Sequence, residues 1–329
     1  MYKIAVDCMG SDLGSKICVE GIKTFMSKHD NVEIYAFGKI NELKELEKVK
    51  NVTIVDCLDV MKMTSGAIEA MRARNTSMYK AIVSVKENNY DGVVSAGSTG
   101  AFLSLASVKI KTVEGVDRAA LITAMPTYGG GKVAVLDIGA NLETSSDQLV
   151  QFAKMGIIYA QKLLNCTHPK VALLSNGAED EKGTSEIKEA NKKLREMNLE
   201  GFVGNIEGRE AILGGSVDVL VTGGYAGNIF LKTYEGAAKM MSNMIKDAFK
   251  TNLSTKIGYL FAKKGFKEIK EKMNYESVGG AMLMGINSVA VKAHGSSNER
   301  AFAQAIEVCF NMVEKEFLNS LKEGVKNNA

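Results

Sequence analysis

Five short apolar runs in this chain each end in a loop of Gly, Ser, Asn or Asp. The runs begin at Val93, Val133, Val171, Val217 and Val289. If they are strands of one parallel sheet, their loops meet at its carboxyl edge, where α/β folds bind ligands. Backbone N–H groups in such loops, and at the helix starts that follow, attract anions. Glycines in tight turns explain any one loop, but five loops with hydroxyl or amide side chains favour a phosphate-binding cleft.

Donor side chains on these loops are suited to acyl transfer in which phosphate itself is the nucleophile. The protein then has only to hold phosphate, orient the carbonyl and stabilise the developing oxyanion. The candidate catalytic residues are Lys182, Asn228 and His294. The candidate phosphate-binding residues are Ser98, Thr99, Gly100, Gly227, Gly295, Ser296 and Ser297. Taken singly, Lys182 is equally a solvated loop lysine, and Asn228 an N-cap.

Several common catalytic motifs are missing from the sequence. Gly129 to Lys132 reads GGGK but lacks the spacing and the hydroxyl residue of a Walker A loop. No G-x-G-x-x-G fingerprint and no G-x-S-x-G elbow occur. Of the three histidines, His29 and His168 lie in polar turns where exposure to solvent is expected, and only His294 lies in one of the five loops. Nucleotide kinases, Rossmann dehydrogenases and serine acyl-enzymes are therefore disfavoured.

Composition narrows the protein class further. The 329 residues carry a net charge of +3, too small to indicate nucleic-acid binding. Five scattered cysteines without a C-x-x-C pair indicate reduced thiols, not a metal site or a disulfide framework. No apolar run reaches the roughly 18 residues of a membrane span, and the first residues resemble a strand, not a signal peptide. We expect a cytoplasmic protein without metal or cofactor.

The elements that position these loops alternate between strand and helix. Such alternation predicts βαβ units and a mostly parallel sheet, the α/β class. A turn at Tyr128 to Gly131 predicts a hairpin of two strands. Two successive helices at about 228–273, with no strand between them, predict a projecting helical hairpin. The length predicts two closely joined lobes, about 1–115 with 286–329, and 116–285.

The loop sequences resemble the bacterial phosphate acyltransferase family over nearly the whole chain. The matching segments are VDCMGSD, SAGSTGA, GVDRAAL, LDIGAN, NGAEDEKGT, GNIEGRE, TGGYAGNIFLKTYEG and GGAMLMGINSVAVKAHGSS. Three positions depart from the family pattern: Gly223 replaces a common Asp, Ser98 a frequent Asn and Ser11 a frequent Gly. The first departure removes an acidic group beside the expected phosphate site.

The resemblance implies a fold, a reaction and partners. The implied fold is an αβα sandwich with a cleft between lobes, related to phosphotransacetylases and to isocitrate and isopropylmalate dehydrogenases. The implied reaction moves a long-chain acyl group from acyl-[acyl carrier protein] to inorganic phosphate, giving acyl phosphate for phospholipid synthesis. Lys182 and Asn228 match active-site positions of the family. A homodimer and a downstream glycerol-3-phosphate acyltransferase are implied as well.

Two further surfaces are predicted from charge and periodicity. Arg72, Arg74 and Lys80 form a compact basic stretch suited to an acidic carrier protein. Eight lysines against three acidic residues fall between Lys246 and Lys272. In that segment the apolar residues Leu253, Ile257, Leu260 and Phe261 recur on one helix face. This face predicts peripheral contact with an anionic membrane, or else burial in the core or a dimer interface.

Three alternatives to the carrier-dependent reaction remain open at this point. A phosphotransacetylase acting on acyl-CoA shares the chemistry. A β-decarboxylating dehydrogenase shares the implied fold but needs a cluster of aspartates for a metal. A non-catalytic membrane-associated scaffold would have the predicted docking and membrane surfaces but no reaction. For the acyl groove, Met240, Met244, Met282 and Met284 are candidate lining residues, with ordinary core packing as the alternative.

Overall fold

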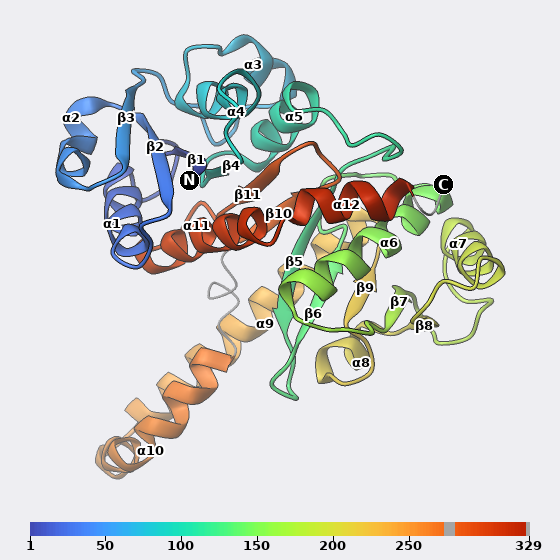
Figure 1. Cartoon of the computed structure of the whole chain (residues 1–329). Coiled ribbons are helices and arrows are strands. Elements are labelled where there is room, and N and C mark those ends of the chain that lie inside the picture. Colours follow the sequence, from blue (N-terminus) through green and yellow to red (C-terminus); the bar gives the residue numbers. More distant parts are fainter. Residues whose placement is uncertain (273–279, 327–329) are drawn as a thin grey trace.

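A single sheet of eleven strands forms the centre of the protein in the computed structural model, which describes residues 1–272 and 280–326 (Figure 1). The strand order is β3-β2-β1-β4-β11-β10-β5-β6-β9-β7-β8. The strands are β1 (Tyr2–Asp7), β2 (Val32–Gly38), β3 (Val52–Asp56), β4 (Gly92–Ser95), β5 (Ala120–Pro126), β6 (Lys132–Leu136), β7 (Val171–Leu174), β8 (Phe202–Ile206), β9 (Val219–Val221), β10 (Ala281–Met284) and β11 (Val289–Lys292). Most pairings are parallel, as predicted, because βαβ crossovers build both ends of the sheet.

Three antiparallel pairings in the middle of the sheet reverse its direction. β5 and β6 form the predicted hairpin, and β10 pairs antiparallel with both β5 and β11. The strands from β6 to β8 therefore run opposite to those from β3 to β11. The five polar loops cannot share one carboxyl edge, so that expectation was wrong. The reason is the antiparallel β5–β6 pairing, because β10, which the sequence patterns did not predict, is antiparallel to both neighbours and leaves β5 parallel to β11.

Helices cover both faces of the sheet. The helices are α1 (Ser15–Met26), α2 (Ile40–Leu43), α3 (Ala67–Arg72), α4 (Ser77–Glu87), α5 (Thr99–Lys109), α6 (Ser146–Leu163), α7 (Ser185–Glu196), α8 (Gly208–Leu213), α9 (Gly224–Lys250), α10 (Leu253–Lys272), α11 (Glu299–Glu314) and α12 (Phe317–Lys326), with a short 3₁₀ helix at Lys44–Lys48. One face packs against α1, α6, α7, α11 and α12. The other packs against α3, α4 and α5 at one end, and against α8 and the start of α9 at the other. This is the expected αβα sandwich.

The alternating side chains of the central strands build two separate apolar layers. On β11, Val289 and Val291 join the layer under α1 and α11, whereas Ala290 joins the layer under α4 and α5. On β10, Met282 and Met284 are buried in the first of these layers. These two methionines are core residues, so they do not line an acyl groove with the exposed Met240 and Met244 of α9.

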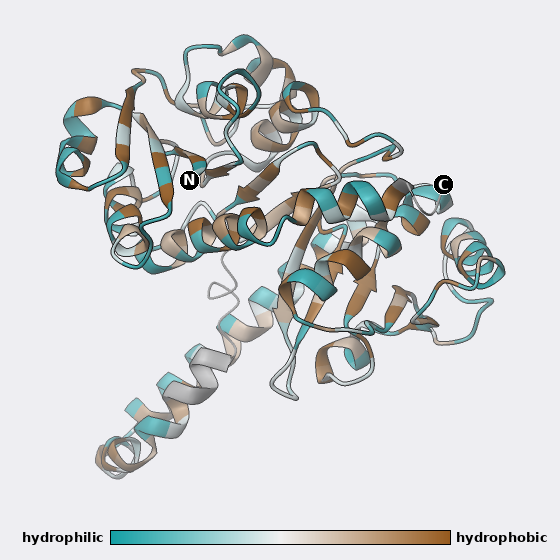
Figure 2. Cartoon of the chain, in the orientation of Figure 1, coloured by the Kyte–Doolittle hydropathy of each residue, from teal (hydrophilic) through white to brown (hydrophobic). Residues whose placement is uncertain are grey.

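The helices α9 and α10 leave the body of the protein as a long antiparallel pair (Figure 1). Apolar residues colour its far end brown in Figure 2. The structure thus confirms a projecting helical hairpin. Residue 273, at the expected end of the hairpin, lies outside the described residues. Residues 327–329 of the expected first lobe lie outside them as well. No helix in the described part of the chain is long and apolar enough to cross a membrane.

Candidate active site

The loops that follow β1, β4 and β11 meet at one edge of the sheet, together with residues 57–66. We call this the first loop cluster. Asp12 N and Ser11 Oγ donate to the carbonyl of Gly295 at 3.0 and 3.3 Å. Ser98 Oγ donates to the carbonyl of Ser65 at 3.2 Å. The predicted residues of the SAGSTG and AHGSS segments therefore lie in one neighbourhood.

Several predicted phosphate-binding side chains of this cluster already have structural partners. Ser98 caps α5, because its Oγ accepts a hydrogen bond from Ala101 N. Thr99 and Gly100 are exposed in the first turn of that helix. His294 Nδ1 accepts from Ser296 N at 3.2 Å and lies 2.8 Å from Ser296 Oγ. Ser297 is buried, and its N–H donates to the His294 carbonyl. Ser98 and Ser297 are therefore structural, whereas Thr99, Gly100, His294 and Ser296 are exposed at the surface of the cluster.

A row of polar residues lies on three neighbouring strands beneath the first loop cluster. Asp7 of β1, Ser95 of β4 and Lys292 of β11 are in register, each the last residue of its strand. Burial raises the pKa of Asp7 to about 6, although Ser77, Ser95 and the Met9 amide donate to its carboxylate. Sequence reasoning missed this row, although a lysine inside the apolar run VAVKA was a usable signal.

The loops that follow β6, β7 and β9 meet at the opposite edge and form the second loop cluster. They line an open cleft of about 1750 Å³. Gly183, next to Lys182, lines one side of the cleft, and Ala226, close to Asn228, lines another. Lys182 and Asn228 are both exposed, and Asn228 packs against the backbone at Gly139. The two predicted oxyanion donors thus lie next to residues that line the same cleft, in the loop before α7 and near the start of α9.

Asp137 organises the loop after β6. Its buried carboxylate accepts from the backbone N–H groups of Leu121, Gly139, Ala140 and Asn141, at 2.8 to 3.1 Å, and from Asn141 Nδ2 at 2.9 Å. The start of α9 then packs directly on this loop. A Cβ on Gly227 would lie 1.9 Å from the Asp137 carbonyl oxygen. Gly227 is needed for this contact, and its N–H donates to Gly223 within the helix.

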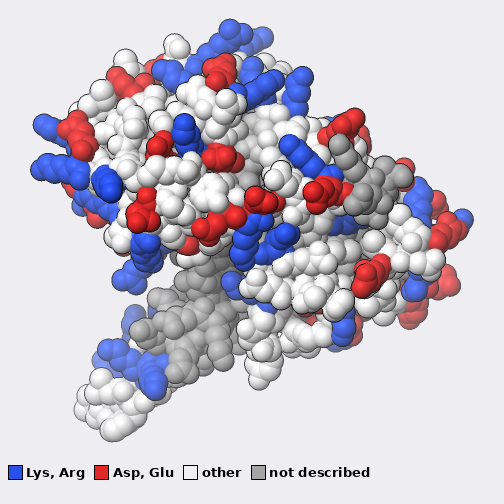
Figure 3. Space-filling model, in the orientation of Figure 1, with Lys and Arg blue, Asp and Glu red and all other residues white. Residues whose placement is uncertain are grey.

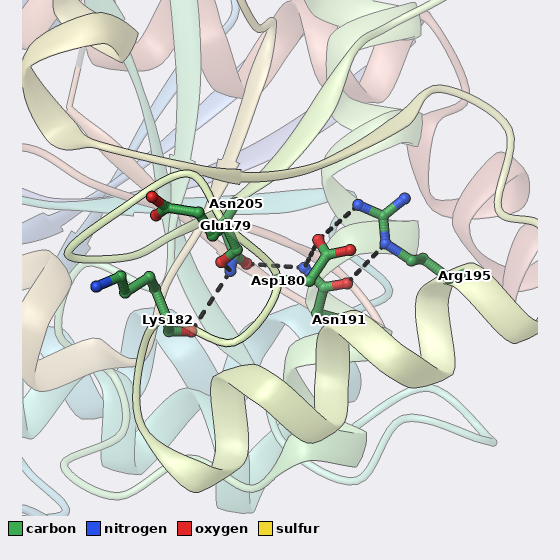
Figure 4. Close-up of polar contacts among 6 residues, drawn as sticks. All are labelled: Glu179, Asp180, Lys182, Asn191, Arg195 and Asn205. Carbon is green, nitrogen blue, oxygen red and sulfur yellow. Dashed lines mark hydrogen bonds and ion pairs between the residues drawn. The ribbon is translucent and has the colours of Figure 1, made fainter.

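A network of buried amides holds the loop that carries Lys182 (Figure 4). Asn205 Nδ2 donates to the carbonyls of Glu179 and Lys182, and Asn191 Nδ2 donates to Asp180 Oδ1 and Asn205 Oδ1. Arg195 binds Asp180 at 2.6 Å. The Lys182 side chain extends away from this network, as Figure 4 shows. The buried amides therefore hold the backbone of this loop, whereas the Lys182 side chain is exposed to solvent.

The helix α9 connects the two loop clusters. It begins in the second cluster at Gly224 and runs back across the sheet. Two turns later Lys232 comes close enough to Lys292 for its charge to act on that lysine. A second opening of about 560 Å³ lies between α3 and α5 and shares Arg118, Ala140 and Asn141 with the cleft. The loop after β6, in the second cluster, therefore lies beside α5, which begins in the first cluster.

The departure at Gly223 has a local consequence in the cleft. A Cβ there would lie 3.3 Å from Thr144 Oγ1. That hydroxyl is buried and has no hydrogen-bond partner among the described residues. Gly223 therefore leaves space beside the unsatisfied Thr144 hydroxyl, and Gly223 and Thr144 both line the cleft.

The two predicted docking surfaces lie outside these clusters. Arg72 and Arg74 are exposed at the end of α3, and Lys80 is half-buried in α4. Leu253, Ile257, Leu260 and Phe261 are exposed along α10. Figure 3 shows lysine and arginine side chains beside the uncharged tip of the hairpin. Burial of this apolar stripe in the core of the same chain is excluded.

Comparison with known proteins decides the family. A family described as "Fatty acid synthesis protein" matches residues 2–320. A protein named phosphate acyltransferase from Aliarcobacter butzleri (strain RM4018) is 40% identical over 314 residues, covering 94% of this chain and 93% of that protein. Another so named, from Clostridium novyi (strain NT), is 39% identical over 330 residues and 98% of both chains. The chain belongs to the phosphate acyltransferase family. The resemblance read from the loop motifs is confirmed, and the protein is an acyltransferase.

Solved structures show where the phosphate acyltransferase fold recurs. A phosphotransacetylase from Streptococcus pyogenes superposes with a TM-score of 0.62 at 16% identity, covering 95% of this chain and 94% of that chain. A branched-chain phosphotransacylase from Enterococcus faecalis V583 gives 0.59 at 15% identity, with coverage of 95% and 99%. At these identities the likeness concerns the fold alone. It confirms the expected fold, which phosphotransacetylases share.

Proposed function

We propose that the protein transfers a long-chain acyl group from acyl carrier protein to inorganic phosphate and releases acyl phosphate for phospholipid synthesis. The observation that carries this proposal is the pair Lys182 and Asn228. Lys182 is exposed on the loop before α7, and Asn228 is exposed near the start of α9; their neighbours Gly183 and Ala226 line one cleft. Buried contacts hold the Lys182 loop and the start of α9 in place. Positioned donors of this kind are what a developing oxyanion requires.

The proposed reaction needs no protein nucleophile. A phosphate oxygen attacks the thioester carbon, and the carbonyl π electrons move to oxygen to give a tetrahedral oxyanion that Lys182 and Asn228 stabilise. The C–S bond then breaks as the C=O bond re-forms, and the carrier leaves as a thiolate. His294, exposed in the first loop cluster, is a candidate to protonate that thiolate. We assign phosphate to the first loop cluster, where Thr99, Gly100, Gly295 and Ser296 offer backbone and hydroxyl groups.

The acyl chain has a candidate path between α3 and α5. Ile68, Met71, Leu103 and Val108 line that opening, which adjoins the cleft at the shared residues Arg118 and Asn141. Ile68 and Val108 are large apolar side chains left exposed to water, which an alkyl chain would cover. This groove replaces the methionine-lined one expected from the sequence.

Partner proteins and the membrane have separate candidate surfaces. The carrier would dock on Arg72 at the end of α3, Arg74 in the turn that follows and Lys80 of α4, near the proposed acyl groove. The tip of the α9–α10 hairpin combines exposed Leu260 and Phe261 with lysines, as peripheral binding to anionic lipid requires. Membrane contact would bring acyl phosphate to a glycerol-3-phosphate acyltransferase. A homodimer would use the exposed Met240, Met241 and Met244 on α9.

The deciding experiment measures phosphate-dependent release of carrier thiol. Palmitoyl-carrier protein and acetyl-CoA are compared as acyl donors, with and without inorganic phosphate, and acyl phosphate is trapped as the hydroxamate. We expect phosphate-dependent release from palmitoyl-carrier at a far higher kcat/KM than from acetyl-CoA. Preference for acetyl-CoA would make the protein a phosphotransacetylase. No release from either donor would leave only the scaffold role.

A further inference from the structure

Lys292 is a buried cation without a carboxylate partner among the described residues. Its side chain is 6% exposed, and the acceptor of its Nζ is the carbonyl of the next residue, Ala293. An ammonium carries three donors, so one carbonyl leaves capacity for further acceptors. Burying a charge in this way is costly unless something else compensates for it.

The nearest buried carboxylate does not provide that compensation by contact. Asp7 accepts from Ser77 Oγ at 2.6 Å, from Ser95 Oγ at 2.7 Å and from Met9 N at 3.2 Å. Ser95 stands between Asp7 and Lys292 in the strand register. Since neighbouring strands are about 4.8 Å apart, the Cα atoms of the two charged residues are separated by roughly 10 Å. Asp7 acts on Lys292 only through space.

The loops above Lys292 contain groups that favour an anion, although the carboxylates of Asp7 and Asp12 also act on its ammonium through space. The first turns of α5 and α11 begin in the loops above it, capped by Ser98 and Asn298. The N–H groups of a first turn are unpaired and lie at the positive end of the helix dipole. Ser65 Oγ, buried in the same cluster, has no partner among the described residues. Lys232 of α9 adds a second positive charge.

We propose that Lys292 binds the attacking phosphate from beneath the first loop cluster, as the residue that positions the nucleophile for transfer. The proposal rests on the function proposed above and deepens it, because it separates phosphate binding from the oxyanion donors Lys182 and Asn228. The Lys292 ammonium supplies charge, and the helix starts supply directional hydrogen bonds. Asp7 and Ser95 keep the floor of the site in place.

The protonation of Lys292 gives this role a pH signature. Burial lowers the pKa of Lys292 to about 8, Asp7 and Asp12 raise it, and Lys232 lowers it. His294 follows two residues later in the same loop. Phosphate affinity should therefore fall as pH rises through about 8, because the ammonium loses its charge there. A phosphate held only by helix starts and hydroxyl groups would show no such loss.

The test compares Lys292→Met with the wild-type enzyme. Methionine has a similar length and suits a buried site, so the fold is expected to survive. We expect a 10- to 100-fold higher KM for inorganic phosphate in Lys292→Met, an unchanged KM for palmitoyl-carrier protein, and no alkaline loss of phosphate affinity. Lys132→Met, at an exposed strand lysine, is the matched control and should behave as wild type.

A binding measurement separates this proposal from the proposed reaction. Inorganic phosphate, at ionic strength matched with chloride, should raise the wild-type Tm, because a ligand that binds only the native state stabilises it. The rise should be absent in Lys292→Met. A phosphate-dependent rise that persists in this variant, or an increase in the KM for the carrier instead of phosphate, would overturn the role of Lys292. Failure of thiol release in the wild type would overturn the reaction, whatever phosphate does to the Tm.

Discussion

Asp7 and Lys292 flank Ser95 on one face of the sheet, each as the last residue of its strand. The two opposite charges are buried on strands that are separated by β4, and they do not form an ion pair. Burial raises the pKa of Asp7 to about 6 and lowers that of Lys292 to about 8. Both pKa values therefore lie near neutral pH, so the protonation of Asp7 and Lys292 can be tested by varying pH around neutrality.

The titration of Asp7 predicts a stability difference that depends on pH. Its folded pKa lies above the ordinary value of 3.8, so its contribution to stability is complete below pH 4 and is lost as pH rises to about 6. Asp7→Asn should therefore gain stability relative to wild type across this range, by up to roughly 3 kcal/mol, since each pKa unit corresponds to about 1.4 kcal/mol. Urea unfolding at several pH values measures this. A constant difference from pH 4 to 6 would show that Asp7 is not shifted.

Loss of the proposed oxyanion donors should impair turnover without unfolding the protein. Lys182→Ala and Asn228→Ala should each lower kcat by about 10²- to 10³-fold, as for loss of one oxyanion donor. Because both side chains are exposed, the Tm should change little. Lys188→Ala and Asn243→Ala, exposed on α7 and α9, are matched controls. Turnover near wild type in either test variant would remove that residue from the mechanism.

Two glycines of α9 should respond in opposite ways to alanine. In Gly227→Ala the new Cβ would overlap the Asp137 carbonyl oxygen, so the helix start must move away from its loop. We expect a loss of roughly 2–4 kcal/mol of stability, typical of strongly disruptive substitutions, together with reduced turnover. Gly236 has open space around it, and Gly236→Ala should gain up to about 1 kcal/mol from helix propensity. Denaturant unfolding compares the two; equal effects would contradict the packing role of Gly227.

Charge reversal on α3 tests carrier docking. The double variant Arg72→Glu, Arg74→Glu should raise the KM for palmitoyl-carrier protein several-fold at low salt and leave the KM for phosphate unchanged. Exposed charges act mainly on association with an oppositely charged partner, and salt screens them. The difference should shrink at about 0.5 M salt for the same reason. If the low-salt KM matches that of wild type, the carrier docks on another surface.

The hairpin tip tests membrane binding. Leu260 and Phe261 are 70% and 86% exposed, and their replacement by Glu should abolish flotation with vesicles of anionic phospholipid. Turnover with soluble palmitoyl-carrier should remain near wild type, because the tip projects away from both loop clusters (Figure 1). Vesicles of neutral phospholipid are the control for charge. Retained flotation would refute membrane insertion at these residues, and conversion to a monomer would place them in a dimer interface.

Local sequence was sufficient for many elements of this protein. Strand and helix periodicities predicted the parallel βαβ units, the β5–β6 hairpin and the projecting α9–α10 pair. The loop motifs identified the family, since their order and spacing are carried by the chain itself. They also singled out Lys182 and Asn228 as donors, although α9 begins at Gly224 and Asn228 lies within its first turns instead of capping it.

The tertiary structure alone decided how these pieces combine. The short strand β10 carries no distinctive pattern, yet its two antiparallel pairings join β11 to β5, and the β5–β6 pairing beyond them divides the polar loops into two clusters. The alignment of Asp7, Ser95 and Lys292 depends on the register of strands far apart in sequence. Gly227, in turn, faces Asp137 only because α9 folds back onto the loop after β6. Contacts of this kind arise from packing between distant segments, which local periodicity does not encode.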